Sequence, residues 1–239
     1  MSAQAASSAV RWWAVIPAAG ASRRMGAASA PKQYLPLAGR AVLEWSLHPF
    51  LERKDCEGVV VVLASDDVWW RSLSVASNPR VLTAVGGAER LHSVLAGLRA
   101  LTHRAGADDW VLVHDAARPC LSADDLDQLL EKLQDDDVGG LLAAPLVDTL
   151  KRADGSDRVL GTVSRDSLWR ALTPQMFRYE LLKRALQLAV DSNLAATDES
   201  QAVEALGLRP RLIAGSADNI KITTRGDMER AARILEERR

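Results

Sequence analysis

The stretch VIPAAGASRRMG, residues 15–26, joins the end of an apolar segment to a loop of small residues that carries two arginines. The apolar segment, residues 12–16, predicts a β-strand that is buried on both faces, as in a parallel sheet. The Pro-Ala-Ala-Gly run at 17–20 leaves little side-chain bulk, so a ligand can approach the backbone closely. Because exposed N–H groups in such a turn bind anionic oxygens, the stretch predicts a phosphate site at the end of a strand.

Positive charge surrounds this turn. Arg23 and Arg24 follow it directly, and Lys32 comes next, within APKQYLPLAG at residues 30–39. Together the backbone donors and these cations are suited to a triphosphate. The stretch is neither a Walker A loop nor a GxGxxG turn. The alternative is an ordinary strand–helix turn with solvated arginines, and Lys32 with its neighbours favours the binding site.

The rest of the chain alternates short apolar runs with amphipathic segments. Strands are predicted at residues 12–16, 58–63, 80–85, 110–113 and 140–144 and near Leu212. Helices are predicted at residues 41–53, 88–103, 122–133, 179–190 and 198–206 and from Asp227 onward. This βαβα order predicts an α/β fold with one doubly wound, mostly parallel sheet and helices on both faces. We expect a single domain over 11–239, a frayed, disordered terminus at 1–10, and ligands at the carboxyl ends of the strands.

Residues 146–169 interrupt this alternation. Two short β-like pieces, VDTLKR and RVLGTV, flank the polar turn ADGSD and predict a hairpin that projects from the domain, within 146–164. Such a β-arm buries little surface by itself. The sequence therefore predicts that the arm packs on another surface, and a second copy of the chain is one candidate for it.

Composition excludes several classes of protein. The 239 residues carry a formal net charge of −1, which argues against a general nucleic-acid binder. The longest clean aliphatic run, residues 59–64, is far too short for a membrane span, and the opening residues lack the features of a secretion signal. Cys56 and Cys120 form neither a disulfide framework nor a metal-ligand spacing, which suits a reducing compartment. We expect a cytoplasmic protein with no nucleic-acid or membrane partner.

The stretch VGGAERLHSVLAGL, residues 85–98, follows another predicted strand. Gly86 and Gly87 expose backbone there and are suited to close contact with a flat base. Ser93 lies early in the next helix, where it either caps the helix or faces the same pocket.

The stretch WVLVHDAARP, residues 110–119, ends a buried strand in His114 and Asp115, with Arg118 just beyond. A carboxylate at this edge of the sheet is suited to Mg²⁺, since that ion prefers hard oxygen ligands. We expect Arg118 to receive a second phosphate and His114 to satisfy a hydrogen bond in the core. The alternative for Asp115 is a helix cap.

Two later stretches give weaker signals. GSADNIKITTRGD, residues 215–227, holds Asp218 and Lys221 and either lies at the site or forms an ordinary salt-bridged loop. Arg165 and Thr173, in VSRDSLWRALTPQMF, are either site or surface residues. No Ser-His-Asp or Cys-His arrangement predicts a covalent nucleophile. Backbone donors, cations and one or two acids are the equipment for phosphoryl or nucleotidyl transfer, which relies on positioning and charge stabilisation.

Seven motifs of the chain occur in the order found in a known family. They are PAAGASRRMG, PKQYLPLAGR, GGAERLHSVLAGL, HDAARP, DTLKR, SRDSLWRALTPQMF and DNIKIT. In this ordered set the chain resembles, from Arg11 onward, the 2-C-methyl-D-erythritol 4-phosphate cytidylyltransferases of the bacterial isoprenoid pathway. The resemblance implies a Rossmann-like nucleotidyltransferase that dimerises through the β-arm. It also implies that the substrate's 4-phosphate attacks the α-phosphorus of CTP with Mg²⁺ present and that pyrophosphate leaves.

The resemblance further implies roles for individual residues. The catalytic residues would be Arg24, Lys32, Arg165 and Lys221, with Arg24 and Lys32 stabilising charge on the pentacoordinate phosphorus. CTP would be bound, largely through the backbone, by Pro17, Ala18, Ala19, Gly20, Gly86, Gly87, Ser93 and Ala116. The sugar phosphate would be bound, in part from a second subunit, by Asp115, Arg118, Thr149, Arg165, Thr173 and Lys221. The candidate ligands for Mg²⁺ or another hard divalent cation are Asp115 and Asp218.

Two other functions compete with this interpretation. A ribitol-5-phosphate cytidylyltransferase is similar, but those enzymes tend to begin AGG where this chain has Ala-Ala-Gly at 18–20, and they depart from HDAARP and DNIKIT. A non-catalytic nucleotide-binding module should lack charge at the reacting phosphorus, whereas Arg24, Lys32 and Asp115 are present. One stretch departs from the family: GAASA, at 26–30, is slightly longer than usual, which affects the path of the loop that delivers Lys32.

Overall fold

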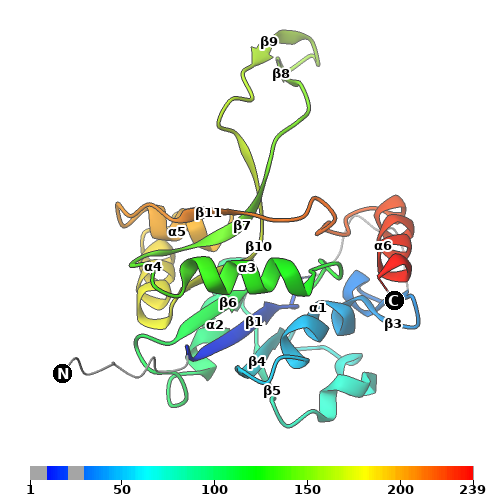
Figure 1. The fold of residues 1–239 in the computed structure, drawn as a ribbon, viewed down its shortest axis with the longest axis vertical. Coiled ribbons are helices and arrows are strands. Elements are labelled where there is room, and N and C mark those ends of the chain that lie inside the picture. The colour runs from blue at the N-terminus through cyan, green and yellow to red at the C-terminus, as the bar shows by residue number, and fades with distance from the viewer. Residues whose placement is uncertain (1–9, 21–29, 239) are drawn as a thin grey trace, which may run out of the picture.

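The computed structural model of the chain describes residues 10–20 and 30–238. Its centre is a seven-stranded sheet in the order β11-β7-β10-β6-β1-β4-β5 (Figure 1). The strands are β1 (Trp12–Pro17), β4 (Cys56–Leu63), β5 (Val81–Val85), β6 (Trp110–Val113), β7 (Gly139–Pro145), β10 (Trp169–Arg178) and β11 (Arg211–Ala214). β1 pairs in parallel with β4 and β6, and the β4–β5 and β7–β11 pairs are also parallel. The predicted Rossmann-like, mostly parallel sheet is therefore confirmed.

Strand β10 is antiparallel to both of its neighbours, β6 and β7, and was not among the strands predicted from the sequence. Pro174 argues against a central strand, because proline cannot donate to the ladder. The pairing with β7 is irregular between Ala171 and Gln175, and the Thr173–Pro174 peptide bond in this segment is cis. The strand also begins exposed and ends buried, so no alternating pattern marks it. Its insertion beside β6 brings Thr173 to the carboxyl end of that strand.

Helices cover both faces of the sheet. They are α1 (Val42–Leu51), α2 (Arg90–Ala100), α3 (Ala123–Leu133), α4 (Tyr179–Asp191), α5 (Glu199–Glu204) and α6 (Arg225–Glu237). Side chains alternate along β1: Trp12, Ala14 and Ile16 pack in one buried cluster with α1 and α3. Trp13 and Val15 point to the other face, where α2, α4 and α5 cover them. Helix α2 begins at Arg90 rather than at 88, so the residues before it belong to a loop at the sheet edge.

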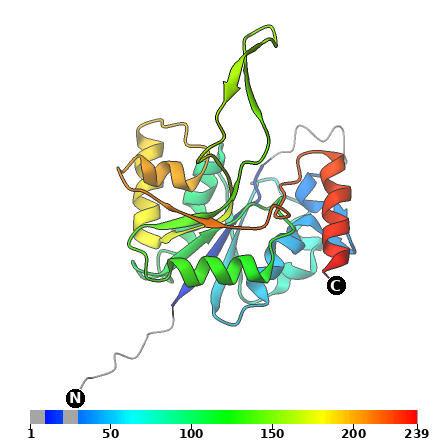
Figure 2. The ribbon, with the colours of Figure 1, turned by 45° about the horizontal axis from the view of Figure 1, so that its top comes forward.

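A third buried cluster joins α6 to the rest of the fold. It contains Trp45 of α1, Ile222 and Leu235, together with the small hairpin of β2 (Pro36–Leu37) and β3 (Arg40–Ala41). In Figure 2, α6 (red) lies at the opposite end of the body from α4 and α5 (yellow and orange). The Ile222 N–H also donates to the Ala117 carbonyl at 2.8 Å, which holds the loop before α6 against the loop after β6.

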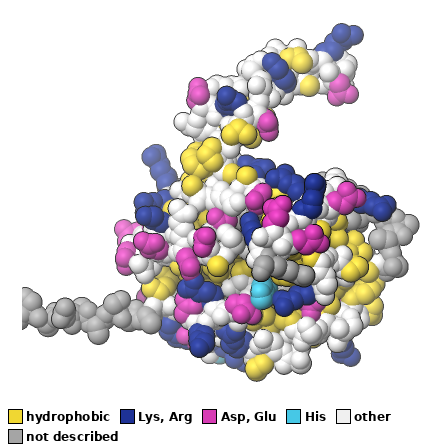
Figure 3. All heavy atoms as spheres, turned by 45° about the vertical axis from the view of Figure 1, so that its right-hand side comes forward, with side chains coloured by type: hydrophobic (Ala, Val, Ile, Leu, Met, Phe, Trp, Pro, Cys, Tyr) yellow, Lys and Arg dark blue, Asp and Glu magenta, His cyan; other side chains and the backbone are white. Residues whose placement is uncertain are grey.

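Strands β8 (Leu150–Ala153) and β9 (Val159–Val163) pair antiparallel and form the predicted hairpin. The hairpin stands away from the body, with hydrophobic side chains along it (Figure 3). Val147, Val159 and Leu160 are 72%, 63% and 64% exposed in the single chain. The predicted projecting arm is confirmed; its use in dimerisation stays a prediction here.

Over residues 10–20 and 30–238, no helix has the length and apolar character needed to cross a membrane. Cys56 and Cys120 are free and buried. Burial raises the pKa of the Cys56 thiol to about 12 and that of Cys120 to about 11. Because the thiolate is the reactive form, these raised values keep both cysteines in the unreactive thiol form at neutral pH.

Gly97 lies on the face of α2 that packs against β1 and β4. A Cβ at this position would lie 2.6 Å from Val15 Cγ1 and 3.0 Å from Val62 Cγ2. We expect Gly97→Ala to lower the free energy of unfolding by about 1–2 kcal/mol through overpacking. Intrinsic helix propensity predicts the opposite sign, a gain of about 1 kcal/mol.

Urea unfolding at fixed protein concentration distinguishes the two effects. Gly155→Ala is the matched control, because a Cβ there meets nothing within 4 Å. This control should change the free energy of unfolding by less than about 0.5 kcal/mol. A Gly97→Ala protein more stable than the wild type would contradict the packing described above.

Candidate active site

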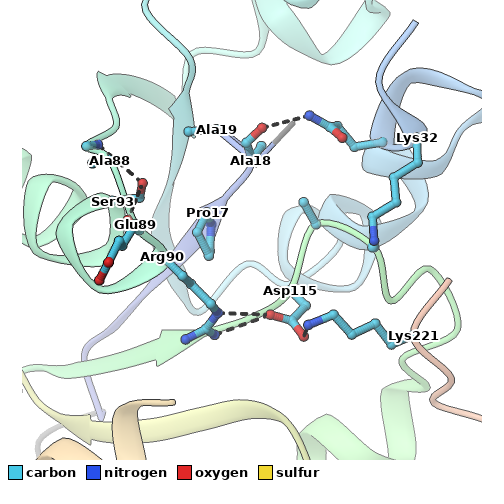
Figure 4. Close-up of a pocket in the computed structure, with 15 residues that line it drawn as sticks. Pro17, Ala18, Ala19, Lys32, Ala88, Glu89, Arg90, Ser93, Asp115 and Lys221 are labelled. Atoms are coloured by element: carbon cyan, nitrogen blue, oxygen red, sulfur yellow. Dashed lines mark hydrogen bonds and ion pairs between the residues drawn. The ribbon is translucent and has the colours of Figure 1, made fainter. Parts of the chain in front are cut away.

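A cavity of about 500 Å³ opens at the carboxyl ends of β1 and β6, beside the loop that precedes α2 (Figure 4). Many of its lining residues are the ones predicted from the sequence: Pro17, Ala18, Ala19, Gly20, Lys32, Gly87, Ser93, Asp115, Ala116 and Lys221. The remaining lining residues were not predicted: Gln33, Ala88, Glu89, Arg90 and Ala117. The cavity therefore lies where parallel α/β sheets collect their ligands.

The turn after β1 has two of its polar groups engaged in the fold. The Ala18 N–H donates to the Val62 carbonyl at 2.8 Å and continues the sheet, so this amide is not available to a ligand. The Ala18 carbonyl accepts a 2.8 Å hydrogen bond from Nε2 of the buried Gln33, which ties the turn to the 3-10 helix at Lys32–Tyr34. Ala19 and Gly20 line the cavity beyond this anchor.

The glycine pair before α2 allows two loops to approach closely. A Cβ on Gly86 would lie 2.6 Å from Ala19 Cβ and 2.7 Å from Ser93 Oγ, so only glycine fits there. The Ser93 hydroxyl donates to the Glu89 carbonyl at 3.1 Å and accepts from the Gly87 N–H at 3.3 Å. Ser93 thus holds this loop and lines the cavity, whereas the alternative of a helix cap is wrong, because the N-cap of α2 is Glu89.

Asp115 is the centre of a charged cluster at the cavity. Its Oδ1 accepts hydrogen bonds from Arg90 Nε and Nη2 at 3.3 and 3.2 Å. Its Oδ2 lies 3.0 Å from Lys221 Nζ and accepts from Arg118 Nε at 3.2 Å. Burial alone would raise the pKa of this carboxyl, but the charges of Arg90, Lys221 and Arg118 outweigh burial and hold it well below its usual range. Asp115 is therefore ionised throughout the physiological pH range.

His114 is fully buried beside Asp115 and makes the core hydrogen bonds expected of it. Its Nε2 lies 3.0 Å from the Arg118 carbonyl, which can only accept, so Nε2 carries the proton. Its Nδ1 then accepts from the Thr173 hydroxyl at 2.9 Å, and the Thr173 oxygen accepts from the Asp115 N–H at 3.1 Å. Burial lowers the pKa of His114 to about 4, which keeps the ring neutral.

Arg118 is held within the fold rather than presented to the cavity. Besides its contact with Asp115, its Nη1 donates to the Asn219 carbonyl at 2.8 Å, and Arg118 is 9% exposed. Asn219 Nδ2 in turn donates to the Thr173 carbonyl at 2.7 Å. Arg118 and Thr173 therefore position Asp115, and neither lines the cavity.

Two lysines of the cavity come from distant parts of the sequence. Lys32 Nζ donates to the Ile222 carbonyl at 2.8 Å, next to Lys221 in the chain. The Lys221 side chain is 43% exposed while its ammonium group contacts Asp115. Together with Arg90 they give the cavity an excess of positive charge over the carboxylates of Asp115 and Glu89.

Several predicted site residues do not lie at this cavity. Thr149 and Arg165 are exposed at the base of the arm, where Arg165 Nη1 donates to the Val147 carbonyl. Asp218 instead faces α6, with Arg230 and Arg238 at 3.6 and 3.9 Å. Arg24 and most of the loop at 26–30 lie outside the described residues.

The described residues offer no preformed metal centre: nowhere in 10–20 or 30–238 do three or more His, Cys, Asp or Glu side chains gather in a way that could hold an ion. Both oxygens of Asp115 already accept hydrogen bonds or ion pairs from cationic side chains. The residues present thus do not fit a magnesium site built from protein ligands alone.

Arg90 is the most important site residue that was not predicted from the sequence. It is the first residue of α2, where the helix dipole disfavours a cation. A cation at that position is favourable only with a carboxylate partner, and in the structure Arg90 forms ion pairs with Asp115 and Glu199. Glu199 gave no signal, because an acid in the first turn of a helix is ordinary.

Comparison with known proteins gives one consistent family. The family described as 2-C-methyl-D-erythritol 4-phosphate cytidylyltransferase matches residues 12–237. A protein of that name from Pseudomonas fluorescens SBW25 is 56% identical over 219 residues, covering 91% of this chain and 93% of the relative. One from Pseudomonas aeruginosa UCBPP-PA14 is 55% identical over 223 residues, covering 93% and 95%. The crystal structure of the Francisella tularensis protein of that name is 34% identical and superimposes with a TM-score of 0.82, covering 94% of this chain and 100% of that one.

The buried imidazole of His114 predicts a pH dependence of stability. Its pKa of about 4 in the folded chain lies below the ordinary value of 6.5. Between these values the unfolded chain binds a proton that the folded chain does not. The contribution of His114 to the free energy of unfolding is therefore fully present above pH 6.5. It falls by about 3 kcal/mol as the pH is lowered toward 4.

Nitrogen NMR of the wild-type protein at pH 5.5 tests the same claim directly. We expect the His114 ring to give the spectrum of a neutral imidazole protonated at Nε2. An imidazolium spectrum for His114 at that pH would contradict the assignment.

Proposed function

The chain belongs to the 2-C-methyl-D-erythritol 4-phosphate cytidylyltransferase family, and we propose that the cavity around Asp115 is its active site. The protein is a nucleotidyltransferase of the non-mevalonate isoprenoid pathway. It transfers the cytidylyl group of CTP to 2-C-methyl-D-erythritol 4-phosphate, giving 4-diphosphocytidyl-2-C-methyl-D-erythritol and pyrophosphate. We locate the site at this cavity because three parts of the chain line it together: the Ala19–Gly20 turn, Lys32 and the Asp115 cluster.

CTP is proposed to lie between the two small-residue loops. The cytosine ring is proposed to lie against Gly87 and Ser93, which line the cavity. Gly86 allows this loop to approach Ala19 closely, so the space left for the flat ring is narrow. The triphosphate then follows the turn toward Gly20 and Lys32. Arg24, outside the described residues, is proposed from the sequence motif as a second cation on the phosphates.

The reaction needs an in-line attack on the α-phosphorus. An oxygen of the 4-phosphate forms the new P–O bond, and the bond to the leaving pyrophosphate breaks. Charge increases on the oxygens of the α-phosphorus and the leaving group, and Lys32 and Arg24 stabilise it. Lys221 and Asp115, which form an ion pair, are proposed to bind the polyol phosphate. These charged groups argue against a non-catalytic module, since binding alone does not require them at the reacting phosphorus.

A hard divalent cation is proposed to enter with the nucleotide. The described residues do not form a magnesium site alone, and Asp218 points away from the cavity toward α6. Mg²⁺ in nucleotide sites takes most of its ligands from phosphate oxygens and water, so this arrangement is compatible with its use.

The arm is proposed to complete the site of a second subunit in a cytoplasmic homodimer. Thr149 and Arg165 lie at its base and do not reach the cavity of their own chain. Val159 and Leu160 near its tip are exposed apolar side chains that a second copy would cover. A partner surface explains both observations, because an isolated two-stranded hairpin gains little from its own packing.

Lys32→Ala should lower kcat by about 10²- to 10³-fold, because it removes a cation from the reacting phosphorus. A pyrophosphate-release assay measures the loss, and circular dichroism checks that the fold is kept. Lys54→Ala, at an exposed lysine outside the cavity lining, is the control and should retain full activity. Turnover by Lys32→Ala within threefold of the wild type would reject the assigned role.

Val159→Ser combined with Leu160→Ser should convert the dimer to monomers and lower activity at least tenfold at equal chain concentration. Size-exclusion chromatography with light scattering gives the mass, and Leu188→Ser, at another exposed apolar residue, is the control. A wild-type protein that is fully active as a 25.9 kDa monomer would contradict the proposed role of the arm.

A further inference from the structure

Glu199 is a fully buried carboxylate at the start of α5 that the reaction as described does not use. Its Oε1 accepts from Arg90 Nη1, and its Oε2 accepts from Arg90 Nη2 at 3.1 Å. A buried charge is costly unless it is paired and hydrogen-bonded. Arg90 supplies that pairing, and Arg90 also lines the cavity.

Arg90 connects two carboxylates. Its Nε and Nη2 donate to Asp115 Oδ1, while its Nη1 and Nη2 donate to Glu199. These contacts use four of the five N–H groups that a guanidinium carries. Although Arg90 lies at the cavity, it therefore has too few free N–H groups to bind a phosphate in a bidentate way. Its donors fix the Asp115 carboxylate instead.

Strand β10 contacts the backbone at Asp115 and also the start of α5, which carries Glu199. The Thr173 hydroxyl oxygen accepts the Asp115 N–H, and two residues later Gln175 reaches the start of α5. Gln175 Oε1 accepts from the Ser200 N–H at 2.8 Å, and its Nε2 donates to Asp198 at 3.0 Å. The two carboxylates that flank Arg90 are therefore placed by one strand.

We propose that Glu199 is a positioning residue for the transfer reaction, acting through Arg90 to fix the Asp115 carboxylate beside Lys221. The inference rests on the proposed function, in which Asp115 and Lys221 bind the polyol phosphate. It also concerns charge: Asp115 and Glu199 balance two of the three cations Arg90, Arg118 and Lys221. One positive charge remains in the cluster to attract a phosphate. Removing the Glu199 charge adds to this surplus, so a higher KM in a Glu199 variant reports the loss of positioning and not the loss of attraction.

Glu199→Gln is the decisive variant, because it keeps the side-chain volume and removes the charge. Its amide nitrogen would face one Arg90 N–H, so one of the two contacts is lost and Arg90 is no longer fixed. We expect the KM for 2-C-methyl-D-erythritol 4-phosphate to rise about tenfold, in the range for a lost charged hydrogen bond. The KM for CTP should change less than twofold. Glu204→Gln, on the exposed end of the same helix, should leave both values unchanged.

A second measurement reports on the contact without any substrate. In the ligand-free wild type, the Arg90 Nε–H should exchange slowly with water and give a resolved nitrogen NMR signal. Glu199→Gln should shift this signal or lose it, and Glu199→Asp, which keeps the charge, should restore part of both the signal and the KM.

Asp115→Asn, measured alongside, separates two kinds of failure. If Asp115→Asn leaves the KM for the polyol phosphate unchanged, the proposed placement of that substrate is wrong and the inference falls with it. If Asp115→Asn raises that KM but Glu199→Gln changes neither the KM nor the Arg90 signal, the proposed function stands and the role of Glu199 is overturned. Equal increases in the KM values for both substrates in Glu199→Gln would also overturn it.

Discussion

The ion pairs of Asp115 with three cations are the interaction on which the rest of the site depends. Arg90 comes from the start of α2, Arg118 from the loop after β6, and Lys221 from the loop before α6. A carboxylate buried in this position is costly unless it is paired, so these contacts hold three separate segments at one point. Because the cations outnumber the acids there, the same contacts leave a surplus of positive charge, which supports the proposed binding of phosphate groups.

The central sheet makes this arrangement available. The parallel strands β1 and β6 end at the same edge and deliver the Ala-Ala-Gly turn and Asp115 side by side. The antiparallel strand β10 then fixes the backbone at Asp115 through Thr173 and the start of α5 through Gln175. Packing of α6 against α1 keeps Lys221 within reach of the site. The strands and helices therefore hold the charged side chains together at this edge of the sheet, and the ion pairs in turn connect these elements.

Much of this could be predicted from the sequence, because the signals were local. Apolar runs followed by small residues marked the parallel strands and their loops, and Asp115, Lys32 and Lys221 lie at the cavity as predicted. The missed features depend on contacts between distant segments. Strand β10 carries Pro174 and has an irregular register, and Glu199 resembles an ordinary helix-start acid until Arg90 is seen beside it. Arg118 and Asp218 show the converse: a charged residue in a site motif can serve the fold, since its partner decides its role.

The most direct test of the account is a crystal structure of the protein with a non-reactive CTP analogue, Mg²⁺ and 2-C-methyl-D-erythritol 4-phosphate. We expect the nucleotide between the Ala19–Gly20 turn and the Gly87 loop, and the polyol phosphate against Lys221 and Asp115 with the Arg90 and Arg118 contacts intact. A complex in which both substrates are ordered but the polyol phosphate lies away from Asp115 would contradict the central claim.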